Sequence, residues 1–350
     1  MGLKYYKNLD GIRAIAALMV IFFHFFHNYQ LEPGLGFLKK ISTFGQTGVD
    51  LFFVLSGFLI TRILFYSKDK KNYFINFYWK RTLRIFPLYY LFLIIFYFGL
   101  PLIGVIDYHG FDQQFYYYIY LQNFALTFNW SNAFGPNHYW SLAVEEHFYL
   151  FWPLLVYFTT KKALSKIVYF IIVFALLLRL YMVYNGLGVF YFTFTRFDAL
   201  ALGALLAILE LKNIFEPKYL TKFLIAMFAV ALPTAFILVK YSGDGNYLVQ
   251  SFKFLLLSLF YFNLIGVVLC LQPTNIINKI LTNNFFSYTG KISFGLYVYH
   301  PMLILILSKY FITGYIIADL LILTTLTYLI ASVSFYGFES HFLKLKKFYS

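Results

Sequence analysis

Residues 9–27 read LDGIRAIAALMVIFFHFFH, an apolar run whose only ionisable side chains are Asp10, Arg13 and two histidines. A helix needs about 20 apolar residues to cross the hydrocarbon layer of a bilayer, and this run is close to that length. Its apolar part is too long for a signal peptide, and no small-residue cleavage site follows it, so we expect it to remain in the mature protein. The stretch predicts a membrane-spanning helix.

The composition extends this prediction to the whole chain. The 350 residues are 61% hydrophobic and 24% aromatic but only 12% charged, with a mean hydropathy of +0.71. Water-soluble proteins carry about a quarter of charged residues, so soluble, disordered and disulfide-stapled classes are excluded. The single cysteine, Cys270, lies in an apolar run, and we expect it to be a small buried hydrophobe.

Ten windows of spanning length follow one another along the sequence. They cover residues 12–30, 48–66, 86–106, 140–159, 167–185, 194–211, 222–240, 250–271, 292–309 and 315–336. The predicted fold class is all-α, a polytopic transmembrane helix bundle with one domain over residues 1–340 and a short basic tail over 341–350. The connection 107–139 has no Lys or Arg and is rich in aromatic and amide residues, so we expect an outward-facing interfacial loop, with room for a short helix.

The distribution of Lys and Arg between these windows predicts the orientation of the chain. One set of loops carries nineteen of them (4, 7, 68, 70, 71, 80, 81, 84, 161, 162, 166, 212, 218, 222, 279, 291, 344, 346, 347), and the other carries five (39, 40, 240, 253, 309). The first set is therefore predicted to be cytoplasmic, together with both termini. The same asymmetry accounts for the net charge of +14 without a nucleic-acid partner.

Arg13 and His24 are the first candidate site residues. Their spacing of eleven residues places them within about 20° of one helix face and about 16 Å apart along the axis. A histidine can accept a proton from a hydroxyl near neutral pH, and an arginine at the rim can hold an anionic group. The alternative is a neutral histidine bonded inside the bundle and an arginine that reaches the lipid headgroups. His27 makes a metal pair with His24 conceivable, but no further ligands are evident, and we expect no metal.

Polar residues also mark the second and third windows. Asp50 opens the second window and needs a partner such as His24 or an arginine, because a charge at membrane depth is costly. Ser56 and Gly57 lie at mid-span and fit either a packing notch or a substrate channel. Arg81 and Arg84 share one helix face, where they suit a phosphate, although positive-inside anchoring would also place them there.

The later windows carry the remaining candidates. In YWSLAVEEHFYLFWP, Glu145 and Glu146 fall within the first two helical turns, where Glu146 suits a helix-dipole role and Glu145 would orient an acceptor hydroxyl or pair with an arginine. Arg196 and Asp198 suggest a structural ion pair. The stretch SYTGKISFGLYVYHP places Lys291 at the rim and His300 about 13 Å deeper, a second cation-and-histidine arrangement.

Six of these motifs occur in the order seen in one family. LDGIRAIAALMVIFFHF, GVDLFFVLSGFLITR, RTLRIFP, YWSLAVEEHFYLFWP, RFDALALGALLA and SYTGKISFGLYVYHP together resemble the acyltransferase-3 family of integral membrane O-acyltransferases, from Leu9 to about Pro301. The resemblance implies a ten-helix bundle that transfers an acyl group, often acetyl, from cytoplasmic acyl-CoA to a hydroxyl of an envelope or exported glycan. It implies His24 as the catalytic histidine with Arg13 as its basic companion. It further implies functional importance for Asp50, Ser56, Arg81, Arg84, Trp140, Ser141, Glu145, Arg196, Asp198 and His300.

The sequence-based hypothesis is therefore O-acyl transfer in the bacterial cytoplasmic membrane, with acetyl-CoA as the expected donor and a glycan or lipid-linked saccharide as acceptor. Arg13, Arg81, Arg84 and Lys291 would hold the CoA phosphates beside Ser56, and His24 would act as general base with help from Glu145 and Asp50. Trp140, Ser141, Arg196, Asp198 and His300 would lie on the acceptor side. Trp140 could stack on a sugar ring, although a Trp at the outer edge of a span is more often an interface anchor.

Some relatives carry an additional esterase-like domain. Because the printed chain ends at Ser350, we expect transfer to be completed within the membrane domain or with a separate partner. The alternative function is a transporter or flippase whose intramembrane Glu and His residues relay protons, but no inverted repeat is visible. A lipid-linked glycosyltransferase would need acidic residues in the first outer loop, which has only Glu32, with Asp50 at its end.

Overall fold

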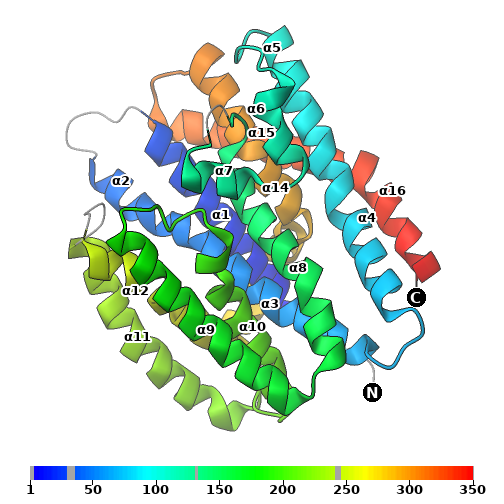
Figure 1. The fold of residues 1–350 in the computed structure, drawn as a ribbon. Coiled ribbons are helices and arrows are strands. Elements are labelled where there is room, and N and C mark those ends of the chain that lie inside the picture. The colour runs from blue at the N-terminus through cyan, green and yellow to red at the C-terminus, as the bar shows by residue number, and fades with distance from the viewer. Residues whose placement is uncertain (1–3, 30–35, 131–132, 241–245, 350) are drawn as a thin grey trace.

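The chain folds into a bundle of helices, shown in Figure 1. The computed structural model describes residues 4–29, 36–130, 133–240 and 246–349, and Glu32 lies outside them. Within these ranges every regular element is helical and no strand occurs. The predicted all-α bundle is confirmed.

Ten long helices correspond to the ten predicted windows. They are α1 (Asn8–Asn28), α3 (Gly48–Ser67), α4 (Tyr73–Ile94), α8 (Trp140–Phe158), α9 (Lys161–Tyr184), α10 (Phe197–Glu210), α11 (Leu220–Lys240), α12 (Tyr247–Cys270), α14 (Asn284–Tyr310) and α15 (Ile316–Ser334). The short helices are α2 (Gly36–Ser42), α5 (Leu100–Leu102), α6 (Phe111–Tyr118), α7 (Gln122–Phe128), α13 (Ile276–Leu281) and α16 (Ser340–Leu345). Two π-helical turns, Ile95–Gly99 and Phe335–Glu339, extend α4 and α15.

Eight stretches of the described chain are long and apolar enough to cross a membrane, and α8 and α10 are not among them. α8 carries Glu145 and Glu146. α10 has 14 residues, and at 1.5 Å per residue it is about 21 Å long, shorter than the hydrocarbon layer. Most of α10 is buried among neighbouring helices, and the first half of α8, which carries the two glutamates, is buried or half-buried.

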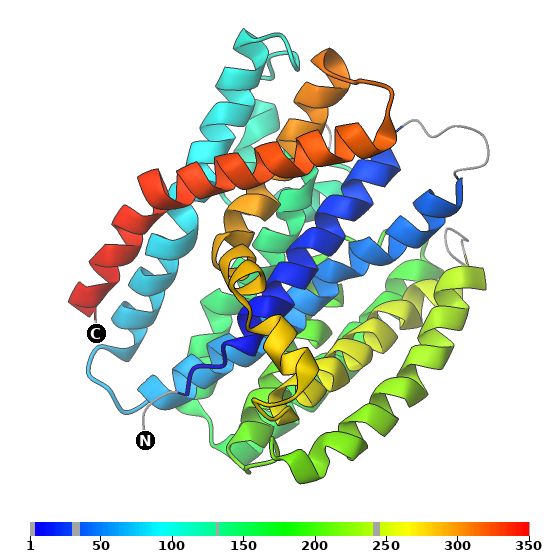
Figure 2. The ribbon, with the colours of Figure 1, turned by 180° about the vertical axis from the view of Figure 1, so that it is seen from behind.

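Small residues allow the central helices to approach closely. A Cβ on Gly57 of α3 would lie 2.0 Å from the carbonyl oxygen of Leu200, and one on Gly203 of α10 would lie 2.0 Å from that of Val54. A Cβ on Gly290 of α14 would similarly lie 2.1 Å from the Asp10 carbonyl oxygen of α1. α1 is thereby held between α3 and α14 in the middle of the bundle, as Figure 2 shows.

The ends of several helices follow ordinary capping chemistry. The side chains of Thr160, Asn246 and Asn283 accept hydrogen bonds from backbone N–H groups in the first turns of α9, α12 and α14. At the last residue of α12, Cys270 is buried, which confirms the expectation from its apolar neighbours.

The predicted interfacial loop is a compact cap built from α6, α7 and the 3₁₀ turn Asn137–Tyr139. Tyrosines of the α4 segment hold it in place. The Tyr89 hydroxyl donates to the Tyr117 carbonyl oxygen at 2.6 Å, and the Tyr97 hydroxyl donates to that of Phe134 at 2.7 Å. Gln122 of α7 in turn donates to the Tyr139 carbonyl oxygen at 2.9 Å, so the cap contacts residues 137–140, which contribute to the site described below.

The end of the chain is folded against α4. α16 and the turn Lys346–Tyr349 run beside α4, as Figure 2 shows in red and cyan. The rings of Trp79 and Tyr349 stack with centroids 5.6 Å apart and planes inclined by 18°. The predicted tail thus packs on the helix that carries Arg81 and Arg84.

Candidate active site

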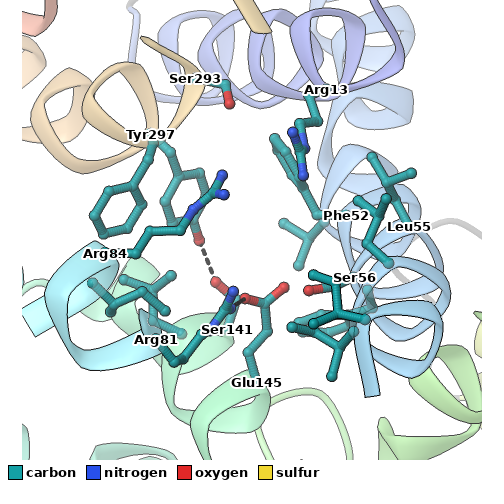
Figure 3. Close-up of a pocket in the computed structure, with 18 residues that line it drawn as sticks. Arg13, Phe52, Leu55, Ser56, Arg81, Arg84, Ser141, Glu145, Ser293 and Tyr297 are labelled. Carbon is teal, nitrogen blue, oxygen red and sulfur yellow. Dashed lines mark hydrogen bonds and ion pairs between the residues drawn. The ribbon is translucent and has the colours of Figure 1, made fainter. Parts of the chain in front are cut away.

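A cavity of about 140 Å³ lies between α1, α3, α4, α8 and α14. Figure 3 shows the arginines Arg13, Arg81 and Arg84 around it, with Ser56 and Glu145 on the facing walls. We call it the arginine cavity. The structure thus brings together the three arginines that the sequence assigned to one site. Their guanidinium groups make the cavity suitable for binding an anion.

Glu145 and Glu146 lie against one of these arginines. The Arg81 guanidinium approaches a Glu145 carboxylate oxygen at 3.4 Å and one of Glu146 at 3.7 Å, and it stacks over the Tyr149 ring at 3.8 Å. Arg13 pairs with Asp10 at 3.1 Å. The expected pairing of Glu145 with an arginine is confirmed. These contacts orient Arg81 without filling the cavity.

A second, larger cavity of about 500 Å³ contains His24. We call it the histidine cavity. Its walls are rich in aromatic side chains and come chiefly from α1, α3, α4, α14, the start of α8 and two loop segments, 134–139 and 190–191. They include His24, His27, Phe92, Asn137, His138, Trp140, Tyr191 and Tyr297. Flat aromatic faces with a few polar groups suit a sugar-like molecule.

The two cavities share the side chains of Val49 and Tyr297. The Tyr297 hydroxyl lies 2.6 Å from Ser141 Oγ and donates to the His138 carbonyl oxygen at 2.7 Å. The dashed line in Figure 3 marks the first of these contacts. Tyr297 therefore forms a fixed partition, with the three arginines on one side and His24 on the other.

His24 is joined to His300 by a hydrogen bond. His24 Nδ1 lies 2.9 Å from His300 Nε2, and His300 Nδ1 lies 3.1 Å from the Leu296 carbonyl oxygen. A carbonyl oxygen only accepts, so His300 Nδ1 carries the proton and its Nε2 accepts from His24 Nδ1. His24 Nε2 is then the unprotonated nitrogen. This tautomer is the one that a general base requires.

The buried acidic residues of α3 and α10 form two ion pairs. Arg196 pairs with Asp50 at 2.6 Å, and Arg179 pairs with Asp198 at 2.7 Å. The predicted partnership of Arg196 with Asp198 is wrong, because residues two apart point to different sides of a helix. Asp50 has the arginine partner expected for it. Its carboxylate is engaged by Arg196, so it braces α3 against α10.

The other predicted residues lie in the arginine cavity, in the histidine cavity or outside both. Gly57 is a packing notch, whereas its neighbour Ser56 lines the arginine cavity and contacts the Tyr149 hydroxyl. Trp140 lines the histidine cavity. Lys291 lines neither cavity, and its ammonium lies 4.9 Å from the Phe335 ring and 5.0 Å from the Tyr336 ring. Arg196 and Asp198 also lie outside both linings.

Three site residues escaped the sequence analysis. His138 stands in the polar loop, where nothing in the sequence signals that it packs beside His300, with ring centroids 5.7 Å apart. Tyr297 precedes His300 by three residues, and this spacing on one helix face was the available signal. Arg179 is a cation inside an apolar window, and a charge at membrane depth indicates a residue that needs a buried partner.

The described ranges contain no evident metal-binding site. No group of three or more His, Cys, Asp or Glu side chains there is arranged to hold a metal ion. His27 instead stacks on Phe23, with centroids 5.3 Å apart, and its ring is exposed at the histidine cavity.

Comparison with known proteins identifies the family. The model of a family described as "Acyltransferase domain" matches residues 6–338. "Putative O-acetyltransferase SACOL0978" of Staphylococcus aureus (strain COL) is 30% identical over 368 residues, which cover 98% of this chain and 58% of the relative. "O-acetyltransferase OatA" of Staphylococcus aureus (strain NCTC 8325 / PS 47) is 28% identical over 361 residues, 96% of this chain and 57% of the relative. The chain thus spans less than two thirds of the length of these relatives.

No solved structure matches the chain. The family match favours an enzyme over the transporter considered from the sequence. With its long apolar helices and its near-complete match to the family model, the chain belongs to the acyltransferase-3 family of membrane proteins.

Proposed function

We propose that the protein transfers an acetyl group from cytoplasmic acetyl-CoA to a hydroxyl of an envelope glycan or lipid-linked saccharide. The observation that carries this proposal is the partition at Tyr297. One side offers three arginines for a phosphorylated donor, and the other offers a histidine and aromatic faces for an acceptor. The relatives named O-acetyltransferases support acetyl as the group transferred.

The donor occupies the arginine cavity in this proposal. Arg13 and Arg84 bind its anionic groups, and the acyl-bearing arm extends toward Tyr297. The excess of Lys and Arg in one set of loops supports a cytoplasmic opening for this cavity and a location in the bacterial cytoplasmic membrane.

The chemical step takes place at His24. The acceptor hydroxyl loses its proton to His24 Nε2 as its oxygen attacks the thioester carbon, and a C–O bond forms. The C–S bond then breaks, and the imidazolium returns the proton to the departing thiolate. His300 keeps the required His24 tautomer by accepting from Nδ1. The products are the O-acyl ester and free CoA.

Donor binding can be tested without knowing the acceptor. Detergent-purified protein is heated with and without millimolar acetyl-CoA, as wild type, Arg84→Ala and Arg13→Ala, with Lys162→Ala as a control on an exposed part of α9. A ligand at a hundredfold excess over its Kd stabilises the folded state by about 2.7 kcal/mol. We expect wild type and Lys162→Ala to be stabilised and the two cavity variants to respond less. No shift in folded wild type would contradict the proposal.

A further inference from the structure

A group of four cations lies beside the arginine cavity, and only part of it belongs to the cavity wall. Lys80, Arg81 and Arg84 lie within five residues of one another on α4, and Lys346 begins the last 3₁₀ turn, Lys346–Tyr349. The turn that begins at Lys346 packs against α4, and the Lys346 ammonium interacts electrostatically with the other three cations. We call these four residues the basic cluster.

The fold holds Lys346 in this position. The π-helical turn Phe335–Glu339 follows α15, and α16 then runs along α4, as Figure 2 shows. Stacking of Tyr349 on Trp79 fixes the last turn three residues beyond Lys346. The chain therefore places a cation next to Arg81 and Arg84 through packing, not through a loose tail.

Among the described residues, only one of the four cations of this cluster is held in ion pairs. Arg81 pairs with Glu145 and Glu146, but none of Lys80, Arg84 and Lys346 forms an ion pair with another described residue. Two carboxylates interact electrostatically with Arg84: that of Glu145, which already pairs with Arg81, and that of Glu339, which accepts a hydrogen bond from Ser334 at 3.2 Å. Like charges held together in this way repel one another unless an anion joins them.

We propose that Lys346, with Lys80 and Arg84, binds the phosphate groups at the nucleotide end of the acyl donor. This inference rests on the proposed function and adds the end of the chain to the donor site. Arg84 belongs to both the cluster and the cavity wall, so an anion here is continuous with the arginine cavity. An anionic lipid headgroup offers the same phosphate chemistry, but Arg84 faces the cavity that the donor enters, which favours the nucleotide.

The test compares two donors that differ in their phosphates. The affinities of acetyl-CoA and of S-acetylpantetheine, which has no phosphate, are measured on protein in nanodiscs of neutral lipid. The variants are Lys346→Gln, Lys346→Arg and, as a matched control on the exposed face of α16, Lys344→Gln. Lys346→Gln should weaken acetyl-CoA binding about three- to tenfold, the range of one charge-assisted contact. It should leave S-acetylpantetheine binding unchanged, and Lys346→Arg should retain wild-type affinity.

The outcomes separate this inference from the proposed function. Equal losses in Lys344→Gln and Lys346→Gln would overturn it, because only net charge would then matter. Wild-type acetyl-CoA affinity in Lys346→Gln would overturn it while leaving the acyl-CoA reaction in place. Failure of wild type to bind either compound would overturn both. If phosphatidylglycerol in the nanodisc removes the difference between wild type and Lys346→Gln, the cluster serves a lipid headgroup and the nucleotide assignment is overturned.

Discussion

His24 Nδ1 lies 2.9 Å from His300 Nε2, and this bond links a residue of the first long helix to one 276 positions later in the sequence. His300 in turn is bonded to the Leu296 carbonyl oxygen of its own helix. The chain of bonds ends at a backbone group that cannot donate, so the proton positions on both rings are determined. In the proposed reaction His300 would act through His24, as a positioning residue.

Replacing His300 should reduce turnover without weakening donor binding. In His300→Ala, His24 loses its acceptor at Nδ1 and the wrong tautomer becomes accessible, so kcat should fall about ten- to a hundredfold. In His300→Gln, the amide oxygen can accept the same hydrogen bond, and part of the activity should return. Steady-state kinetics of acetyl-CoA consumption measure both.

A structural role for His300 would give a different result. If His300→Ala raised KM for acetyl-CoA or lowered thermal stability in proportion to the loss of kcat, the ring would serve packing and not the tautomer. The absence of any rescue by His300→Gln, in a variant that melts like wild type, would also contradict the positioning role.

Substitutions of Asp50 and Arg196 should have strongly non-additive effects on the free energy of unfolding. Arg196 is 1% exposed and Asp50 is 4% exposed, so removing one partner leaves a buried unpaired charge that costs about 3–5 kcal/mol. Arg196→Met should therefore lower the melting temperature markedly. The double variant Asp50→Leu/Arg196→Met should recover part of this loss, because neither charge remains.

A double-mutant cycle on purified protein measures this coupling. Simple addition of the two single losses would mean that the pair does not act as a unit. It would also remove the argument that Asp50 braces α3 against α10 instead of assisting His24.

Adding a methyl group at the contact between α3 and α10 should destabilise the protein. Gly57→Ala would place a Cβ 2.0 Å from the Leu200 carbonyl oxygen, and backbone cannot move aside as a flexible side chain can, so we expect a loss of about 1–3 kcal/mol. Gly188→Ala is the matched control, since no atom lies within 4 Å of its added Cβ. Thermal melting compares the two, and equal stability of both variants would contradict the close packing.

Much of the fold was accessible from the sequence because lipid imposes a simple rule. Each of the ten apolar windows became a helix, and Arg13 and His24 lie along one side of α1, as their spacing predicted. The sequence could not show how α8, which carries two glutamates, and α10, which has 14 residues, are covered by the other helices. Their helices are stabilised by burial among neighbours, which depends on tertiary packing.

The site was only partly predictable for a related reason. Residues on one helix, such as Arg81 and Arg84, could be grouped by their spacing. Partners on different helices could not, and so Asp198 was assigned to Arg196 although Arg179 reaches it from α9. His138 lies in a turn held by hydrogen bonds to Val298 and from Tyr297 of α14, and no periodic pattern in the sequence describes such contacts.

The most direct test of the account separates binding from chemistry at His24. Membrane vesicles containing wild type or His24→Ala are supplied with radiolabelled acetyl-CoA on the cytoplasmic face, and label in the envelope glycan fraction is counted. We predict that His24→Ala lowers transfer by about two to four orders of magnitude while acetyl-CoA still stabilises the purified variant as it does wild type. Near-wild-type transfer by a folded His24→Ala protein would contradict the assignment of His24 as the general base.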